Sequence, residues 1–173
     1  PSHLANASKY PFVFSITPTP LDLAKITMNF ISEKSGIKVK KPKVIFVGFS
    51  DHLSRHFLEE TKEYARTQGI DIGPDIWISD VSQFGDKEGK HFAPLLATIN
   101  SYHPDFAYLS LPSKEASLLL QEVKKTDLKT KWIGSMRTFD ENLSPFDVVL
   151  GVQPISPFGE DIPGMADVKA AHH

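Results

Sequence analysis

The chain contains no cysteine among its 173 residues, which excludes disulfides, thiolate nucleophiles and cysteine-based metal sites. No apolar run approaches the roughly 18 residues that a membrane-spanning helix needs. The net charge is only -2, so the sequence lacks the basic surplus expected of a protein that binds nucleic acid. The apolar content of 40% and the charged content of 23% are ordinary for a globular protein, and the length allows one domain with its own core.

The sequence also lacks the motifs of common nucleotide-binding and hydrolytic enzymes. Neither phosphate-binding glycine pattern, G-x-G-x-x-G or G-x-x-x-x-G-K-[ST], occurs. Gly134-Ser135-Met136 does not complete the G-x-S-x-G turn that carries a nucleophilic serine. No set of residues supplies a nucleophile, a base and an orienting group. We therefore expect a protein that is not an enzyme and that needs no cofactor.

One pair of histidines suggests a metal site at first sight. His52 and His56 are four residues apart, close to Asp51, and therefore share one face of a predicted helix. The H-E-x-x-H pattern is absent, however, and no third ligand is evident. The sequence therefore favours two solvated or partly packed histidines and predicts no metal site.

What the sequence does contain is a repeated alternation of short apolar runs and amphipathic stretches. This alternation is typical of βα units and predicts a three-layer α/β sandwich with a mostly parallel, doubly wound, flavodoxin-like sheet. The continuous apolar runs Val44–Val47 and Phe106–Leu109 are expected to be covered on both faces. The predicted strands are Phe12–Ile16, Val44–Val47, Asp75–Ile78, Phe106–Leu109, Trp132–Ile133 and Val148–Val152.

Amphipathic stretches between these runs predict four helices. The first follows Thr19 and runs to about Gly36, and the second follows Ser50 and Asp51 and stops at Gly69. The third spans about 91–102, and the fourth begins at about 112–113. Thr19 and either Ser50 or Asp51 are candidate helix caps.

Such sheets bind ligands beyond the carboxyl ends of their strands. Four segments are predicted to meet at this edge: 17–21, 48–53, 110–113 and 134–138. They supply hydroxyl groups, glycine backbone and helix N-termini, whose free N–H groups suit a carboxylate or another anion. Helix capping alone explains any one of these Ser, Thr and Asp residues equally well.

Several segments resemble one protein family, in the same order along the chain. Residues 10–18 (YPFVFSITP) resemble a hinge-crossing strand of the form P-[YF]-x-F-R-x-x-P. Residues 104–108 (PDFAY) resemble the pattern P-D-x-[VI]-[YF], and 128–134 (LKTKWIG) resemble G-L-K-x-x-[IFW]-x-G. Further matches lie at 43–47, 90–93 and 148–152, and the order and spacing of all six segments carry the resemblance. Together they resemble the second lobe of a type I periplasmic binding protein, of the branched-chain amino-acid (leucine/isoleucine/valine-type) solute-binding family of ABC transporters.

The resemblance implies a two-lobed clamp that closes on a ligand by a hinge. It implies that 1–9 is a linker from a missing first lobe, that 10–155 is the ligand-binding lobe, and that 156–173 leads back toward the missing lobe. The terminal histidines are either natural or the remnant of a tag. It further implies a periplasmic or extracytoplasmic location with a signal peptide absent from this sequence, a small-molecule ligand, a membrane permease as partner, and no nucleic acid.

This chain departs from the family pattern at the expected binding edge. In the amino-acid binders an acidic residue meets the ligand's ammonium group, and Met136 aligns at that position, with Arg137 beside it. Arg137 either binds a ligand carboxylate through a bidentate contact or faces solvent. A carboxylate, an amide or an aromatic acid is thus at least as well suited as an amino acid. The candidate ligand-binding residues are Thr17, Thr19, Phe49, Ser50, Leu53, Ser110, Pro112, Ser113, Met136 and Arg137.

Three hypotheses for function follow from these observations. The leading one is a solute-binding lobe that captures a small metabolite, an amino acid or a small organic acid or amide, for an ABC importer. The alternative is the ligand-sensing domain of a receptor or regulator with the same fold. The third is a small α/β enzyme of flavodoxin-like shape, against which the missing catalytic motifs argue.

Overall fold

A computed structural model describes residues 18–34, 41–78, 92–138 and 149–151 of the chain. Strands and helices alternate along it, as the sequence predicts. The helices are α1 (Pro20–Asn29), the short π-helix η2 (Phe30–Lys34), α2 (His52–Thr67), α3 (Ala93–Tyr102) and α4 (Ser113–Val123). The strands are β1 (Lys43–Phe49), β2 (Asp71–Ile78), β3 (Phe106–Ser110), β4 (Lys131–Gly134) and β5 (Val149–Gly151). The predicted strand Phe12–Ile16 lies outside the described residues.

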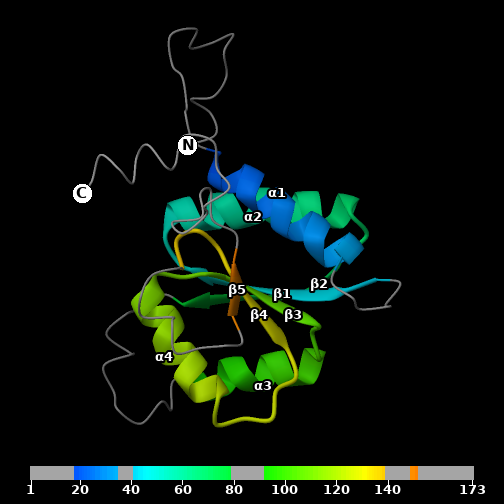
Figure 1. The fold of residues 1–173 in the computed structure, drawn as a ribbon. Coiled ribbons are helices and arrows are strands. Elements are labelled where there is room, and N and C mark those ends of the chain that lie inside the picture. Colours follow the sequence, from blue (N-terminus) through cyan, green and yellow to red (C-terminus); the bar gives the residue numbers. More distant parts are fainter. Residues whose placement is uncertain (1–17, 35–40, 79–91, 139–148, 152–173) are drawn as a thin grey trace, which may run out of the picture.

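The five strands form one sheet in the order β2-β1-β3-β4-β5, and every described pairing is parallel. Helices α1 and α2 cover one face of the sheet, and α3 and α4 cover the other (Figure 1). These are the three layers of a doubly wound α/β sandwich, and they confirm the predicted fold class.

Two apolar cores lie on opposite faces of this sheet. Alternate residues of β1 divide between them, because successive side chains of a strand point to opposite faces. Ile45 and Val47 join the core beneath α3 and α4, whereas Val44 and Phe46 join the core beneath α1 and α2. All four are at most 2% exposed, and β3 is buried along its whole length. The prediction that these two runs are covered on both faces is therefore confirmed.

Strand β2 begins four residues earlier than the sequence analysis predicted. Its first half contains Gly73 and Pro74, which read as a turn rather than as a strand. In the pairing with β1, Val44 is opposite Ile72 but Phe46 is opposite Asp75, so β2 carries one extra residue there. A bulge and a proline without a donor N–H are both tolerated because β2 lies at the edge of the sheet.

The first helix also differs from its prediction, since α1 ends at Asn29 and continues as the π-helix η2. Both predicted caps are found. Thr19 and Asp22 form a reciprocal capping box at the start of α1, and Asp51, not Ser50, is the cap of α2. Gly69 follows α2 with a φ of 73°, the left-handed conformation typical of a glycine that ends a helix.

The packing of α2 on β1 depends on a glycine near the end of that strand. A Cβ atom at Gly48 would overlap the side chain of Leu58 and would lie 2.6 Å from Cζ3 of Trp77. Only glycine therefore permits this close approach of helix to strand. The contact holds α2 against the carboxyl-terminal end of β1, where the candidate site is expected.

Two leucines allow the importance of the buried strands to be tested with one chemical change. Leu109 of β3 is 0% exposed and Leu53 is 65% exposed. We expect Leu109→Ala to lower the free energy of unfolding by about 2–5 kcal/mol, because it leaves a cavity between close-packed elements. Leu53→Ala is expected to stay within about 0.5 kcal/mol of the unmodified protein. Urea unfolding measures both, and equal losses in the two variants would contradict this account of the core.

Candidate ligand-binding site

The direction of the chain through the sheet reverses between β1 and β3. From β1 it passes to β2 on one side, and it then crosses to β3 on the other side. The crevice outside the carboxyl ends of the strands at such a reversal is the usual ligand site of open α/β sheets. Segments 48–53 and 110–113 follow these two strands, and 134–138 follows the neighbouring β4. The structure thus brings three of the four predicted segments to one edge of the sheet.

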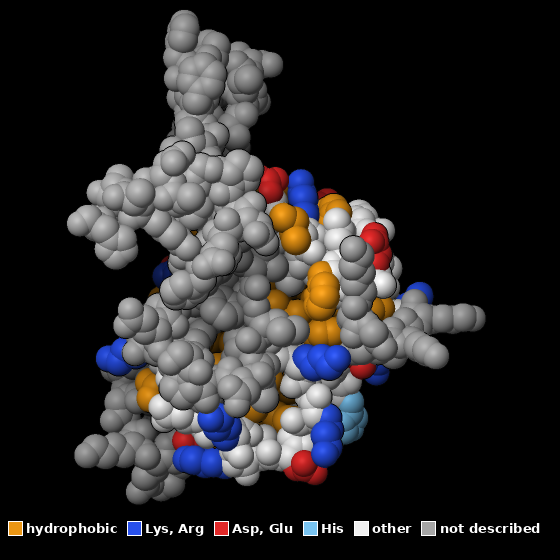
Figure 2. Space-filling view, viewed as in Figure 1, with side chains coloured by type: hydrophobic (Ala, Val, Ile, Leu, Met, Phe, Trp, Pro, Cys, Tyr) orange, Lys and Arg blue, Asp and Glu red, His pale blue; other side chains and the backbone are white. Residues whose placement is uncertain are grey.

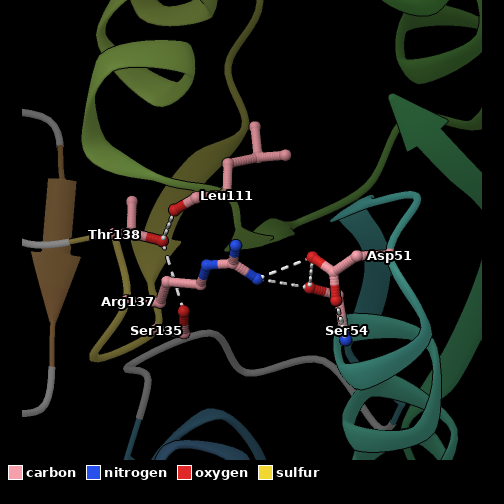
Figure 3. A network of polar contacts seen from close by, with 6 residues as sticks. All are labelled: Asp51, Ser54, Leu111, Ser135, Arg137 and Thr138. Carbon is pink, nitrogen blue, oxygen red and sulfur yellow. Dashed lines mark hydrogen bonds and ion pairs between the residues drawn. The ribbon is translucent and has the colours of Figure 1, made fainter. Parts of the chain in front are cut away.

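Arg137 connects the two sides of this reversal (Figure 3). Its Nη1 donates to Oδ2 of Asp51 at 2.8 Å and to Oγ of Ser54 at 2.7 Å. Its guanidinium carbon also lies 5.8 Å from the centroid of the Phe49 ring. The side chains of Arg137 and Asp51 are 43% and 32% exposed. Arg137 is therefore neither buried nor free in solvent, because residues at the start of α2 hold one end of its guanidinium group.

The carboxylate of Asp51 is held by three donors. Oδ1 accepts the backbone N–H of Ser54 at 2.7 Å, and Oδ2 accepts the Ser54 hydroxyl at 2.9 Å as well as Arg137. Partial burial of this carboxyl works to raise its pKa, but the hydrogen bonds from Ser54 and Arg137 outweigh burial. The pKa of Asp51 consequently lies below its ordinary value of 3.8. Asp51 is therefore ionised at neutral pH, both as a helix cap and as the partner of Arg137.

The turn that carries Arg137 is fixed to the end of β3 by a buried threonine. Thr138 is 0% exposed, and its Oγ1 lies 2.9 Å from the carbonyl oxygen of Leu109 and 3.0 Å from that of Leu111. Its single proton is used in these contacts. The hydroxyl of Ser135, 3.2 Å away, must therefore donate to Thr138. Sequence reasoning missed this role of Thr138, although serine and threonine hydroxyls often bond to nearby backbone in turns.

Several predicted site residues have structural roles. Thr19 N–H donates to Oδ2 of Asp22 at 2.9 Å, and the Thr19 hydroxyl accepts the Asp22 N–H, which is the capping box of α1. Ser50 N–H donates to the carbonyl of Ile78 at 2.8 Å, and its hydroxyl accepts from Arg55. Ser110 is only 2% exposed. Thr17 lies outside the described residues. None of the contacts of Thr19, Ser50 or Ser110 joins the group around Arg137.

The remaining predicted residues are accessible and mostly apolar. Leu53 and Met136 are among the most exposed large apolar side chains of the described residues, and they are the sequence neighbours of Ser54 and Arg137. Phe49, Pro112 and Ser113 are half-buried, with Pro112 in the cap position of α4. The arrangement is a cation at the reversal point with accessible apolar side chains in the same segments, and it suits an amphipathic anion.

Other parts of the described chain do not compete with this site. A depression of about 550 Å³ follows the outer edge of β2, away from the carboxyl ends of the central strands, and it is lined partly by Lys62, Arg66 and Asp75. Across residues 18–34, 41–78, 92–138 and 149–151, no group of three or more His, Asp or Glu side chains is placed to hold a metal ion. The face seen in Figure 2 carries side chains of both charges interspersed. Nowhere in the described part is a helix long and apolar enough to span a membrane.

The buried hydroxyl of Thr138 can be tested by a nearly isosteric change. Thr138→Val is expected to lower the free energy of unfolding by about 1–3 kcal/mol, because it leaves the Leu111 carbonyl without this donor and the Ser135 hydroxyl without its acceptor. Thr67→Val is the matched control, since the Thr67 hydroxyl donates to a carbonyl in an exposed position, and we expect it to change stability by less than about 0.5 kcal/mol. Thermal or urea unfolding measures the stability of both variants. An equal loss of stability in the two would show that the Thr138 hydroxyl does not hold this turn.

The charge of Asp51 can be separated from its capping role, because asparagine caps helices as well as aspartate does. With a folded-state pKa below 3.8, the charge contributes fully above the unfolded pKa and is lost as the pH falls through the folded pKa. Asp51→Asn should therefore cost about 0.2–1 kcal/mol at pH 7, as expected for a partly exposed ion pair. The deficit should shrink below pH 3.8.

The measurement for Asp51→Asn is a series of urea unfolding curves from pH 7 to pH 3 for both proteins. Asp127→Asn provides the control, because the side chain of Asp127 is 96% exposed and its removal should give no comparable pH-dependent gap. If Asp51→Asn lowers the free energy of unfolding by the same amount at pH 7 and at pH 3, the charge of Asp51 does not contribute to stability.

Neither any family model nor any curated protein matches the chain. Its fold does match solved structures of ABC transporter proteins. A branched-chain amino acid ABC transporter structure from Thermus thermophilus with bound valine aligns over 97% of this chain, with a TM-score of 0.73 and 18% identity. A substrate-binding protein from Desulfitobacterium hafniense aligns over 98%, with a TM-score of 0.70 and 16% identity. A solute-binding protein from R. palustris in complex with benzoate aligns over 80%, with a TM-score of 0.59 and 20% identity.

The chain covers 42%, 46% and 35% of these three chains, which is less than half the length of each. At such low identity the matches show a shared fold. They confirm the resemblance predicted from the sequence motifs. This chain shares the fold of part of these ABC transporter solute-binding protein structures.

Proposed function

We propose that this chain is the ligand-binding lobe of an extracytoplasmic solute-binding protein that captures a small metabolite for an ABC importer. The observation that carries the proposal is the arrangement beside the reversal point between β1 and β3, where Arg137 and accessible apolar side chains lie on the segments at the ends of β1 and β4, the two strands that flank β3. Such edges bind small ligands in open α/β sheets. The likeness in fold to ABC transporter solute-binding proteins supports the same assignment.

The proposal includes a second lobe that completes the binding site. The chain spans less than half of the structures that it matches, and ligand sites usually bury most of the surface of their ligand. One exposed edge cannot do so alone. Residues 10–155 would form the lobe described here, and 1–9 and 156–173 would lead to the first lobe. Closure of the two lobes about a hinge would then present the loaded protein to a membrane permease.

The ligand of this lobe would be a small amphipathic metabolite: an amino acid, an organic acid or an amide. Leu53, Met136 and Phe49 offer apolar contacts, and Arg137 offers charged donors. Of the matched proteins, one was solved with valine and another with benzoate, which illustrates the range that related folds accommodate. The residues of this edge do not resemble a catalytic group, so the proposed role is binding without chemistry.

The test is ligand screening by thermal shift on the whole protein that contains this chain, with a panel of amino acids and their matched acids and amides. A true ligand at a hundredfold excess over its Kd should stabilise the folded protein by about 2.7 kcal/mol. The isolated chain should bind the same compound far more weakly, because half of the enclosing surface is absent. Micromolar binding to the isolated chain would contradict the lobe assignment. A panel without any ligand for the whole protein would contradict solute binding.

A further inference from the structure

Within the described part of the chain, one end of the Arg137 guanidinium group is hydrogen-bonded and one edge is not. Both hydrogen bonds that Arg137 donates to described residues come from Nη1, and they use its two protons. Among the described residues, neither Nε nor Nη2 has a partner. The N–H groups of Nε and Nη2 lie along one edge of the planar group, in the fork geometry that grips a carboxylate bidentately. With 43% of the side chain exposed, this edge is open to a ligand.

The start of α2 fixes the direction in which this edge points. Ser54 is 3% exposed, and its N–H and hydroxyl both hold Asp51, which caps the helix. Arg137 is thus anchored to a regular element rather than to a mobile side chain. Its entropy of ordering is already lost before a ligand arrives, and such preorganisation favours binding.

The neighbouring carboxylate does not cancel the attraction for an anion. Asp51 sits at the N-terminus of α2, where the helix dipole contributes roughly half a positive elementary charge. That positive end offsets part of the charge of Asp51. A carboxylate at the Nε–Nη2 edge of Arg137 would form charge-assisted hydrogen bonds with the guanidinium group.

An ammonium group finds no comparable partner among the accessible predicted residues of this edge. Leu53, Met136 and Phe49 are apolar, and the Asp51 carboxylate is already engaged by Ser54 and Arg137. A second carboxylate, Glu115 in the first turn of α4, has a buried Oε2 without a hydrogen-bond partner. Pro112 occupies the cap of that helix and has no N–H to donate to Glu115 in a capping box. Glu115 is only 6% exposed, so it is not among the accessible side chains of this edge.

We propose that Arg137 selects the ligand: its Nε and Nη2 bind the carboxylate of a monocarboxylic acid that has an apolar body and no ammonium group. Leu53, Met136 and Phe49 contact the apolar body. The inference rests on the proposed function, since it assigns a ligand class to the same edge. The residue that determines ligand specificity, Arg137, would then itself be positioned by the cap of α2.

The experiment is calorimetry on the whole protein with 4-methylpentanoate, 4-methylpentanamide and leucine, and with benzoate and benzamide as an aromatic pair. The unmodified protein should bind an acid at least tenfold more tightly than its amide, and 4-methylpentanoate at least tenfold more tightly than leucine. Arg137→Gln should abolish both preferences. Arg137→Lys should restore them only in part, because lysine keeps the charge but lacks the fork. Arg66→Gln, a change on an exposed part of α2, should leave them unaltered.

A second variant keeps the test informative if Arg137→Gln disturbs folding. Met136→Glu places a carboxylate beside Arg137 and should shift the preference from 4-methylpentanoate to leucine by tenfold or more. Preference for leucine in the unmodified protein, unchanged by Arg137→Gln but lost in Glu115→Gln, would overturn the inference while leaving solute binding intact. Absence of binding by any compound, including the wider panel of amino acids, would overturn both the inference and the proposed function.

Discussion

Burial of β1 and β3 on both faces is the constraint on which the rest of this structure depends. Alternate residues of these strands belong to two separate cores, so each strand needs helices on either side. Parallel pairing then requires a crossover after every strand, and α2, α3 and α4 provide these crossovers. Because β2 and β3 lie on opposite sides of β1, consecutive crossovers diverge there. Among the described residues the segments that follow these strands therefore separate at this end of the sheet, which is where open α/β sheets usually bind ligands.

The contact between Arg137 and Asp51 matters for geometry more than for stability. Ion pairs that are a third or more exposed contribute about 1 kcal/mol or less, which is small beside the loss from emptying one core leucine position. The contact nevertheless joins residues 86 positions apart in the sequence. The buried Thr138 fixes the turn from one side and the cap of α2 fixes the guanidinium group from the other. Because the Thr138 turn and the cap of α2 are both fixed, even a weak contact between them is sufficient to orient the Arg137 side chain.

Local sequence patterns were sufficient for most of the fold. Continuous apolar runs located β1, β3 and β4, and Thr19 and Asp51 were recognised as possible caps from their side chains alone. The first half of β2 was missed, because Gly73 and Pro74 are turn residues in most contexts, and only the position of the strand at the sheet edge permits them. The predicted strand Phe12–Ile16 lies outside the described residues.

The candidate site was predictable only in outline. The three segments at the edge follow from the strand pattern, but Ser110 is interior, a fact that depends on how α4 and β4 pack around it. The pairing of Arg137 with Asp51 has no local signal, since it arises from the placement of two distant turns by the sheet. The sequence allowed two roles for Arg137, and the structure shows a third, in which Nη1 is anchored while Nε and Nη2 have no partner among the described residues.

The most direct measurement of the central claim is the NMR signal of the arginine Nε–Hε groups during titration with a carboxylic acid. The chain contains only three arginines, Arg55, Arg66 and Arg137, so each signal can be assigned by substitution. Ligand at millimolar concentration makes weak binding to this chain detectable. Our account predicts that benzoate shifts the Arg137 signal while those of Arg55 and Arg66 stay in place, and that benzamide shifts none. Movement of all three signals together, or an Arg137 signal that responds equally to benzamide, would contradict it.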